Sequence, residues 1–316
     1  MKHLESALTK DNEWFGYFLM LTIIPFVSQL PAILPFIIIK TITPLPEGVD
    51  ESMVDLMNPV SYGVNPTIAL ALMIFPFITM LIGFIACYKP FHGRNFKNVI
   101  NGTTSIRWRR IIIGFAVCFV VASFFLVVDY YMNIKKYELR LNWRALIPLA
   151  VVSFLLIPFQ AFYEEIVFRG YIAQGVGRLF KNRLVVILVP SLLFALLHAF
   201  NPEVEKHGFW AMMPFYFIAG LTYAIISILD DGIELAMGLH AANNIFSSIF
   251  IVTEDSVFQT EALLLLKNVE INTEYLPFIL SQIIIVGAIA FKYRWKLKTL
   301  FTKVGDDDKE LEFAQV

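Results

Sequence analysis

Long apolar runs separated by short polar connections dominate this sequence of 316 residues. A helix needs about 20 predominantly apolar residues to cross the hydrocarbon core of a bilayer. Eight segments reach or approach that length, so the pattern predicts eight membrane-spanning helices. They cover residues 15–41, 67–88, 111–132, 146–160, 184–200, 209–229, 233–252 and 276–291. The first contains Pro25, Pro31 and Pro35, which predict a kink or an interruption.

These segments predict one all-α domain, a polytopic transmembrane helical bundle of about eight spans over residues 15–293. Residues 146–252 form the core that contains the motifs described below. We expect residues 1–14 to be an N-terminal cytoplasmic segment and residues 294–316 to be a charged C-terminal tail. The acidic residues near the N-terminus and the length of the following apolar run argue against a cleavable signal peptide.

Composition supports a multi-pass integral membrane protein. Hydrophobic residues make up 58% of the chain, charged residues only 16%, and the mean hydropathy is +0.68. A water-soluble domain of this length would need more polar residues for its surface. No basic tract with interleaved aromatic residues indicates nucleic-acid binding. Cys87 and Cys118 lie in different apolar runs, so a disulfide framework is not indicated.

Basic residues predict the orientation. The connection 89–110 and the segment from 292 onwards are rich in Lys and Arg, and the first of these has no acidic residue. Positive charge gathers on the cytoplasmic side of membrane proteins, so we expect both connections and both termini to be cytoplasmic, in the cell membrane. The acid-rich stretches 47–55 and 254–274 then lie on the opposite side. The basic residues between 135 and 144 argue against this orientation.

The stretch 160–169 places two carboxylates and a guanidinium at the end of an apolar run. A charged side chain at bilayer depth costs at least ~2.5–3.5 kcal/mol, so intramembrane charge indicates function by default. Glu165 and Arg169 have the i, i+4 spacing of a helical ion pair. Glu164 has no local partner, which makes it the better candidate for a general base.

A turn at residues 180–183 predicts an antiparallel hairpin between the fourth and fifth helices. If the turn centres on residue 181, Glu164 and His198 face each other, because they lie equally far from it. The three glycines within 170–178 would allow the chain to bend there.

Two histidines lie within apolar helices beside polar or aromatic neighbours. His198 shares a helix face with Phe194, and His240 shares one with Asn244. The remaining histidines, His3, His92 and His207, lie in polar stretches where solvated side chains are expected. Residues 231–234 resemble a capping box, and small residues at 220 and 224 predict close helix packing.

Three short motifs therefore occur in order on separate apolar segments: Glu164-Glu165-x-x-x-Arg169, Phe194-x-x-x-His198 and His240-x-x-x-Asn244. This set resembles the CAAX-protease and bacteriocin-processing (CPBP, or Abi) family of intramembrane endopeptidases, of the type II CAAX prenyl endopeptidase kind. The resemblance extends over residues 146–250, roughly a third of the chain.

The resemblance implies a membrane peptidase with a water-accessible cavity between the fourth, fifth and seventh helices. Glu164 and His198 would hold and activate the hydrolytic water, and His240 and Asn244 would stabilise the oxyanion. The supporting residues would be Glu165, Arg169 and Phe194. The substrate would be a membrane-associated peptide or protein, prenylated for some members and bacteriocin-like for others.

The family is also described as metallo-type. In that version a single zinc ion would be held by Glu164, His198 and His240, with water at the open fourth position. No His-Glu-x-x-His motif is present, and spacing does not decide between the two versions. We favour the glutamate mechanism without a metal.

Two other functions are compatible with these residues. A non-catalytic immunity or scaffold protein could retain the fold for binding. A transporter or proton relay also uses intramembrane Glu and His residues, although no inverted repeat is visible here. The identity of the substrate and the oligomeric state do not follow from the sequence.

Overall fold

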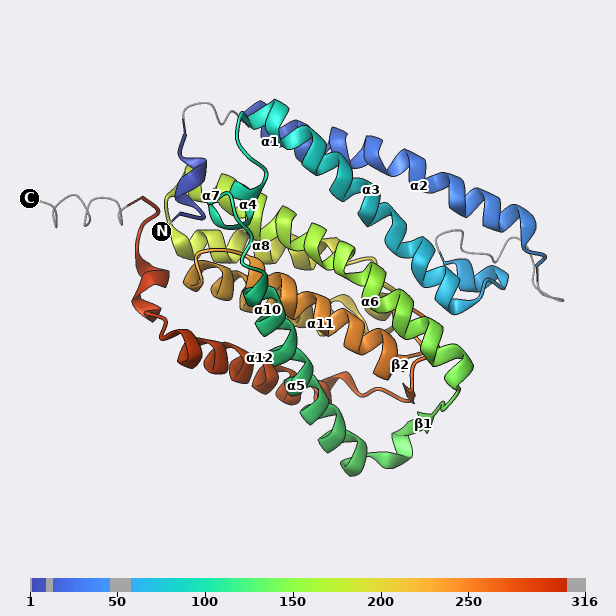
Figure 1. The fold of residues 1–316 in the computed structure, drawn as a ribbon. Helices are drawn as coiled ribbons and strands as arrows, with labels where there is room; N and C mark the ends of the chain where they lie inside the picture. Colours follow the sequence, from blue (N-terminus) through green and yellow to red (C-terminus); the bar gives the residue numbers. More distant parts are fainter. Residues whose placement is uncertain (1, 10–13, 46–57, 306–316) are drawn as a thin grey trace, which may run out of the picture.

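A computed structural model describes residues 2–9, 14–45 and 58–305. The described chain is a bundle of helices with one small sheet (Figure 1). In chain order the α-helices are α1 (Trp14–Leu21), α2 (Ile23–Ile42), α3 (Pro66–His92), α4 (Lys97–Asn101), α5 (Trp108–Met132), α6 (Trp143–Glu165), α7 (Ala173–Phe180), α8 (Arg183–Leu197), α9 (Pro202–His207), α10 (Phe209–Leu229), α11 (Glu234–Phe250) and α12 (Ile271–Tyr293). A π-helical segment, η5 (Ile166–Ile172), joins α6 to α7.

All eight predicted apolar segments are helical, but they differ in length. Within the described residues, six helical stretches are long and apolar enough to cross a membrane: Trp14–Ile42, Pro66–His92, Trp108–Met132, Trp143–Phe180, Phe209–Leu229 and Ile271–Tyr293. The other two are shorter, because α8 has 15 residues and α11 has 17. The prediction of about eight spans thus corresponds to six helical stretches of full spanning length and two shorter apolar helices, and the helical bundle is confirmed.

The first span is interrupted at Thr22, between α1 and α2. Pro25 has no N–H to donate to the carbonyl of Leu21, and its ring crowds that carbonyl. The helix is therefore interrupted just after Leu21. Pro31 and Pro35 lie inside α2.

Helix α11 lies at the centre of the bundle, between α5 and α6 (Figure 1). It approaches α5 closely because both helices have a glycine at the contact. A Cβ atom on Gly238 would lie 2.0 Å from the carbonyl oxygen of Ile111, and one on Gly114 would lie 2.2 Å from that of Leu235. Gly220 of α10 likewise approaches Ser191 of α8, which confirms the predicted packing role of the small residues there.

The sequence did not predict the sheet. Strand β3 (Leu264–Leu266) pairs antiparallel with β1 (Tyr137–Leu139) and parallel with β2 (Ile251–Thr253). Each strand has three residues, too few for a period of two to be visible. Figure 1 shows β1 and β2 at the end of the bundle opposite to the N-terminus.

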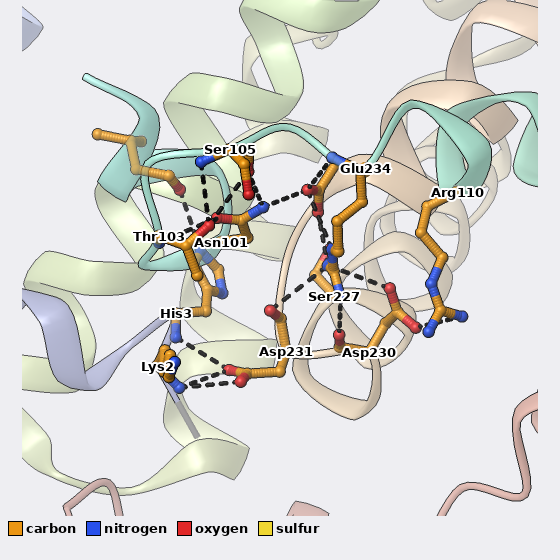
Figure 2. A network of polar contacts seen from close by, with 12 residues as sticks. Lys2, His3, Asn101, Thr103, Ser105, Arg110, Ser227, Asp230, Asp231 and Glu234 are labelled. Atoms are coloured by element: carbon orange, nitrogen blue, oxygen red, sulfur yellow. Dashed lines mark hydrogen bonds and ion pairs between the residues drawn. The ribbon is translucent and has the colours of Figure 1, made fainter. Parts of the chain in front are cut away.

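Residues 2–9 pack against the bundle. The carboxylate of Asp231 accepts hydrogen bonds from the backbone N–H groups of Lys2 and His3 at 2.9–3.0 Å (Figure 2). His3 is 1% exposed, and Leu4 and Ala7 are equally buried. The expectation that His3 is solvated was wrong, because the short 3-10 helix η1 (Glu5–Ala7) turns this segment onto the protein.

Glu234 has a different role from the predicted capping box. The structure assigns no side-chain cap to α11. The Glu234 carboxylate is buried and pairs with the guanidinium of Arg107 at 2.6 Å, while the side-chain amide of Asn101 donates to it as well (Figure 2). Asp231 and Glu234 thus hold two separate segments against the start of α11.

The other two histidines outside the motifs are also partnered. His92 is buried, and its Nε2 lies 2.6 Å from the hydroxyl of Tyr171. His207 Nε2 lies 2.8 Å from the carboxylate of Asp255. The expectation of solvated side chains fails because the polar connections fold back onto the helices.

Part of the predicted C-terminal tail is also packed. A 3-10 helix, η6 (Leu297–Phe301), follows α12, and Val304 is buried with its N–H bonded to the carbonyl of Lys181. Glu5 connects the two ends, because its carboxylate accepts from Arg183 at 2.7 Å and from the N–H of Gly305 at 3.2 Å. Residues 306–316 and the acid-rich stretch 47–55 lie outside the described residues. Among the described residues, the remaining 3-10 helices are η3 (Pro59–Tyr62) and η4 (Ile134–Lys136).

Candidate active site

Glu165, at the last turn of α6, is the centre of a buried polar network. Its Oε1 accepts from Nη1 of Arg169 at 2.9 Å, and both side chains are 0% exposed. The predicted ion pair is thus confirmed. The same oxygen lies 2.8 Å from Nδ1 of His240 on α11. Because a carboxylate paired with arginine only accepts, Nδ1 of His240 is the donor.

Arg169 lies in η5 and is enclosed by aromatic rings. Its guanidinium carbon is 4.3 Å from the ring centroid of Phe194 and 5.3 Å from that of Tyr223. Its Nη2 donates to the carbonyl of Gly220 at 3.3 Å. Cation–π contacts and a carboxylate partner compensate for the desolvation of this charge.

Glu164, the neighbour of Glu165, has one bonded and one unbonded oxygen. Oε1 accepts from the side-chain amide of Gln160 at 2.9 Å. Oε2 is buried and has no hydrogen-bond partner within the described residues. It lies 3.7 Å from Nε2 of His240, so this imidazole stands between the two glutamates.

Asn244 is one turn beyond His240 on α11, as predicted, and faces the same network. Its side-chain N–H donates to Oε1 of Gln160 at 3.3 Å. Gln160 thereby links Asn244 to Glu164. A single cavity of about 1030 Å³ is lined by Gln160, Glu164, Phe194, His198, His240 and Asn244, among others.

His198 follows the last residue of α8 and occupies its C-cap. Its Nδ1 lies 2.7 Å from the carbonyl oxygen of Phe194, and its ring stacks on Tyr216 of α10 with centroids 4.4 Å apart. The structure does not support the predicted direct contact between Glu164 and His198. The two share the cavity, but Glu164 bonds to Gln160 while His198 stacks on Tyr216.

Three further residues of this site were not predicted. Gln160 stands one turn before Glu164 in an apolar run, which is a signal that sequence reasoning could have used. Tyr223 stacks on His240 with centroids 5.3 Å apart, and Tyr216 stacks on His198. Nothing in the sequence marks these two tyrosines, because they are ordinary aromatic residues of an apolar helix.

The side chains do not fit the zinc site of the metallo-type alternative. Within residues 2–9, 14–45 and 58–305, no group of three or more His, Cys, Asp or Glu side chains is arranged to hold a metal ion. The imidazole of His240 lies between the two glutamates, whereas that of His198 stacks on Tyr216. We therefore derive no step through zinc.

Comparison with known proteins agrees with the motifs. Residues 142–246 match the family model described as type II CAAX prenyl endopeptidase Rce1-like. This segment is similar to an Rce1-like domain. It includes every motif residue from Glu164 to Asn244 and extends from α6 into α11.

One curated relative is the uncharacterized protein YyaK of Bacillus subtilis (strain 168). It is 34% identical over 166 residues, which are 52% of this chain and 55% of that protein. The chain thus spans about half the length of the curated relative it matches. No solved structure matches. The similarity to the Rce1-like family therefore comes from sequence comparison alone. The geometry of the site comes from the structure described above.

Proposed function

We propose that this protein is an intramembrane endopeptidase that hydrolyses a peptide bond of a membrane-associated substrate. The observation that supports this most is the state of Glu164. One carboxylate oxygen is held by Gln160. The other is buried, has no hydrogen-bond partner among the described residues and lies 3.7 Å from an imidazole nitrogen, in a side chain that lines a large cavity. A positioned carboxylate of this kind is suited to take a proton from water.

The proposed reaction uses Glu164 twice. Its Oε2 takes a proton from a water molecule, whose oxygen attacks the carbonyl carbon of the peptide bond. The electron pair of the C=O bond moves to the oxygen and gives a tetrahedral oxyanion. The C–N bond then breaks, and Glu164 returns the proton to the leaving amine.

His240 and Asn244 are placed to stabilise the oxyanion. The Nδ1–H of His240 donates to Glu165, which directs Nε2 towards Glu164. Nε2 can therefore donate to the oxyanion only when the imidazole carries a second proton. Asn244 uses one N–H on Gln160 and has a second. Donors aimed at developing charge contribute about 3–4 kcal/mol each in comparable sites. In this proposal, Glu165 and Arg169 position His240 instead of acting on the substrate.

His198 has the second role in holding the water. Its Nδ1 faces the carbonyl of Phe194, so Nδ1 donates and Nε2 is free to accept. His198 and Glu164 line the same cavity on different helices. A water held between them would be fixed by two acceptors from different helices.

The cavity wall is suited to a membrane-associated peptide. Apolar side chains of α3, η5 and α8, including Met73, Phe77, Val167 and Leu193, line it together with the polar residues above. An apolar substrate segment can be buried there while its peptide bond reaches Glu164. Prenylated peptides and bacteriocin-like peptides are the two substrate classes to be tested.

The test is hydrolysis by the purified protein in detergent. A pool of fluorogenic peptides, with and without a prenylated cysteine, is offered to the wild type, Glu164→Ala and His198→Ala. We expect each substitution to lower kcat/KM by about 10²–10⁴-fold, the usual contribution of a general base, with the Tm unchanged. Glu138→Ala, at an exposed residue of β1, serves as the control.

Full activity of Glu164→Ala would contradict the proposal. Glu164→Gln separates this function from a non-catalytic one, because an amide retains the shape but cannot take the proton. A scaffold or immunity protein would tolerate Glu164→Gln in cells. Loss of the wild-type activity on addition of a chelator would replace the glutamate mechanism with the zinc version.

A further inference from the structure

A second polar cluster lines the same cavity at the end formed by α9 and α10. The hydroxyl of Tyr216 donates to the carboxylate of Glu203, and the side-chain amide of Asn201 donates to the same hydroxyl at 2.9 Å. All three residues line the cavity together with His198 and Glu164. The mechanism above uses none of the three.

The ring of Tyr216, on α10, stacks on the His198 imidazole. The two rings are stacked, with centroids 4.4 Å apart and planes inclined by 26°. The ring of Phe194 is tilted against the imidazole, with ring centroids 4.5 Å apart. His198 therefore lies between an aromatic ring of its own helix and one of α10.

The position of His198 makes this contact important. It occupies the C-cap of α8, after the last helical residue. A side chain there is not oriented by the packing of a complete helical turn, and the bond from Nδ1 to the carbonyl of Phe194 fixes only one point of the ring. Stacking on Tyr216 restricts rotation about that point, because offset stacking favours one ring plane.

Tyr216 is itself held in place. Its hydroxyl donates to Glu203 and accepts from Asn201, so the phenol has a partner on each side. A hydroxyl bonded to a carboxylate forms a stronger hydrogen bond than one bonded to a neutral acceptor. Asn201 and Glu203 flank the start of α9, which follows His198 closely in the chain.

We propose that Tyr216 is a positioning residue for His198, and that Glu203 and Asn201 fix Tyr216 in the orientation that this requires. The consequence for turnover rests on the proposed peptidase function. Nε2 of His198 must stay within hydrogen-bond reach of the water that Glu164 activates. A displacement of about 1 Å in such a group can cost on the order of 10²-fold in rate.

The first test does not depend on activity. Histidine Cε1–H resonances are recorded by NMR on the full chain in detergent micelles, and the resonance of His198 is assigned by its absence in His198→Gln. A stacked ring shifts this resonance, so we expect Tyr216→Leu to move it furthest. Tyr216→Phe keeps the ring but loses the bonds to Glu203 and Asn201, so it should move the resonance by a smaller amount. Tyr275→Leu is the matched control. Tyr275 of α12 stacks on Phe215, the neighbour of Tyr216 in α10, with ring centroids 4.5 Å apart, and Tyr275 does not line the cavity.

The second test separates positioning from substrate binding. With the same pool of fluorogenic peptides, we expect Tyr216→Leu to lower kcat by 10–100-fold while KM stays within about twofold of the wild type. The kcat of Tyr216→Phe should lie between those of Tyr216→Leu and the wild type, because it keeps the ring without its hydroxyl bonds, and Tyr275→Leu should resemble the wild type.

The outcomes are distinct. If Tyr216→Leu leaves both the His198 resonance and kcat unchanged, the inference is wrong. If the resonance moves but the wild type cleaves no peptide, the positioning role is supported and the peptidase function fails. If Tyr216→Leu does not fold, Glu203→Leu replaces it, because loss of the acceptor should shift the same resonance, whereas Glu203→Gln should not.

Discussion

Glu165 is the residue on which the geometry of the candidate site depends most. It is completely buried and holds both Arg169 and His240 through one oxygen. A buried ion pair contributes little net stability compared with apolar residues of the same volume, but removing one partner leaves an uncompensated charge. The pair therefore fixes the orientation of His240 more than it stabilises the fold.

Removing the arginine tests this balance. We expect Arg169→Met to destabilise the protein by about 3–5 kcal/mol, because the carboxylate of Glu165 then remains buried beside apolar side chains. The measurement is the Tm of each variant in the same detergent, monitored by tryptophan fluorescence. Arg140→Met, which breaks the exposed pair with Glu138 at 3.2 Å, should leave the Tm almost unchanged.

The double variant Glu165→Gln/Arg169→Met completes the cycle. It removes both charges, so it should recover part of the lost Tm without recovering activity. If the single and double variants have the same Tm, unpaired charge is not the cause of the instability.

At the scale of elements, the contact between α5 and α11 positions His240. Gly114 and Gly238 let the two backbones approach to a distance that a methyl group would prevent. His240 is only two residues after Gly238. Any displacement of α11 at this contact is therefore transmitted to the imidazole.

We expect Gly238→Ala to lower both the Tm and kcat, because the new methyl group would lie 2.0 Å from the carbonyl oxygen of Ile111. Gly287→Ala in α12 is the control, since no atom lies within 4 Å of the position of its Cβ. That variant should keep the wild-type Tm or raise it slightly through the helix propensity of alanine. A Tm for Gly238→Ala equal to that of the control would show that the helices can separate at no cost.

Elements of this kind differ in how well the sequence predicts them. Long apolar runs determine the positions of α3, α5, α10 and α12, and the i, i+4 spacing of Glu165 and Arg169 determines their pairing. The sequence could not show that His240 bonds to Glu165, because this contact depends on how α6 and α11 cross. It also could not show the stack of His198 on Tyr216, since His198 lies just beyond the end of its helix.

At the scale of the whole molecule, both described ends of the chain are joined at one end of the bundle. Asp231 holds residues 2 and 3 (Figure 2). Glu5 holds Arg183 and Gly305. The basic connection that contains Arg94 and Lys97 lies at this same end (Figure 1). That this side faces the cytoplasm of a cell membrane stays a prediction.

The attachment of residues 2–7 should depend on pH. Burial lowers the pKa of His3 to about 4, and Arg107 acts in the same direction, while Asp231, Glu234 and the bond to Val99 oppose the shift. At pH values between 6.5, the ordinary pKa of histidine, and about 4, His3 of the released segment binds a proton that His3 of the docked segment does not. Docking is therefore strongest above pH 6.5 and weakens as the pH falls towards 4, by up to about tenfold per pH unit.

Hydrogen–deuterium exchange of residues 2–7, corrected for intrinsic rates, measures this equilibrium. We expect lower protection at pH 5 than at pH 7 in the wild type, and a smaller difference in His3→Gln. Equal protection at both pH values in the wild type would show that docking does not depend on the proton of His3.

The segment η5 connects these two regions of the molecule within one continuous helix. Before it stand Glu164 and Glu165, and after it stands Gln174, whose side-chain amide donates to the carbonyl oxygens of His3 and Asn98 at 2.8 Å. A π-turn is wider than an α-turn, so the number of residues in η5 sets the angle at which α7 leaves α6. Deleting one residue would rotate α7 by about 100° and turn Gln174 away from its acceptors. A surface connection can tolerate an insertion or deletion of one residue. The same change in η5 would alter the position of Glu164 and Glu165 relative to Gln174 and the N-terminal segment that Gln174 holds.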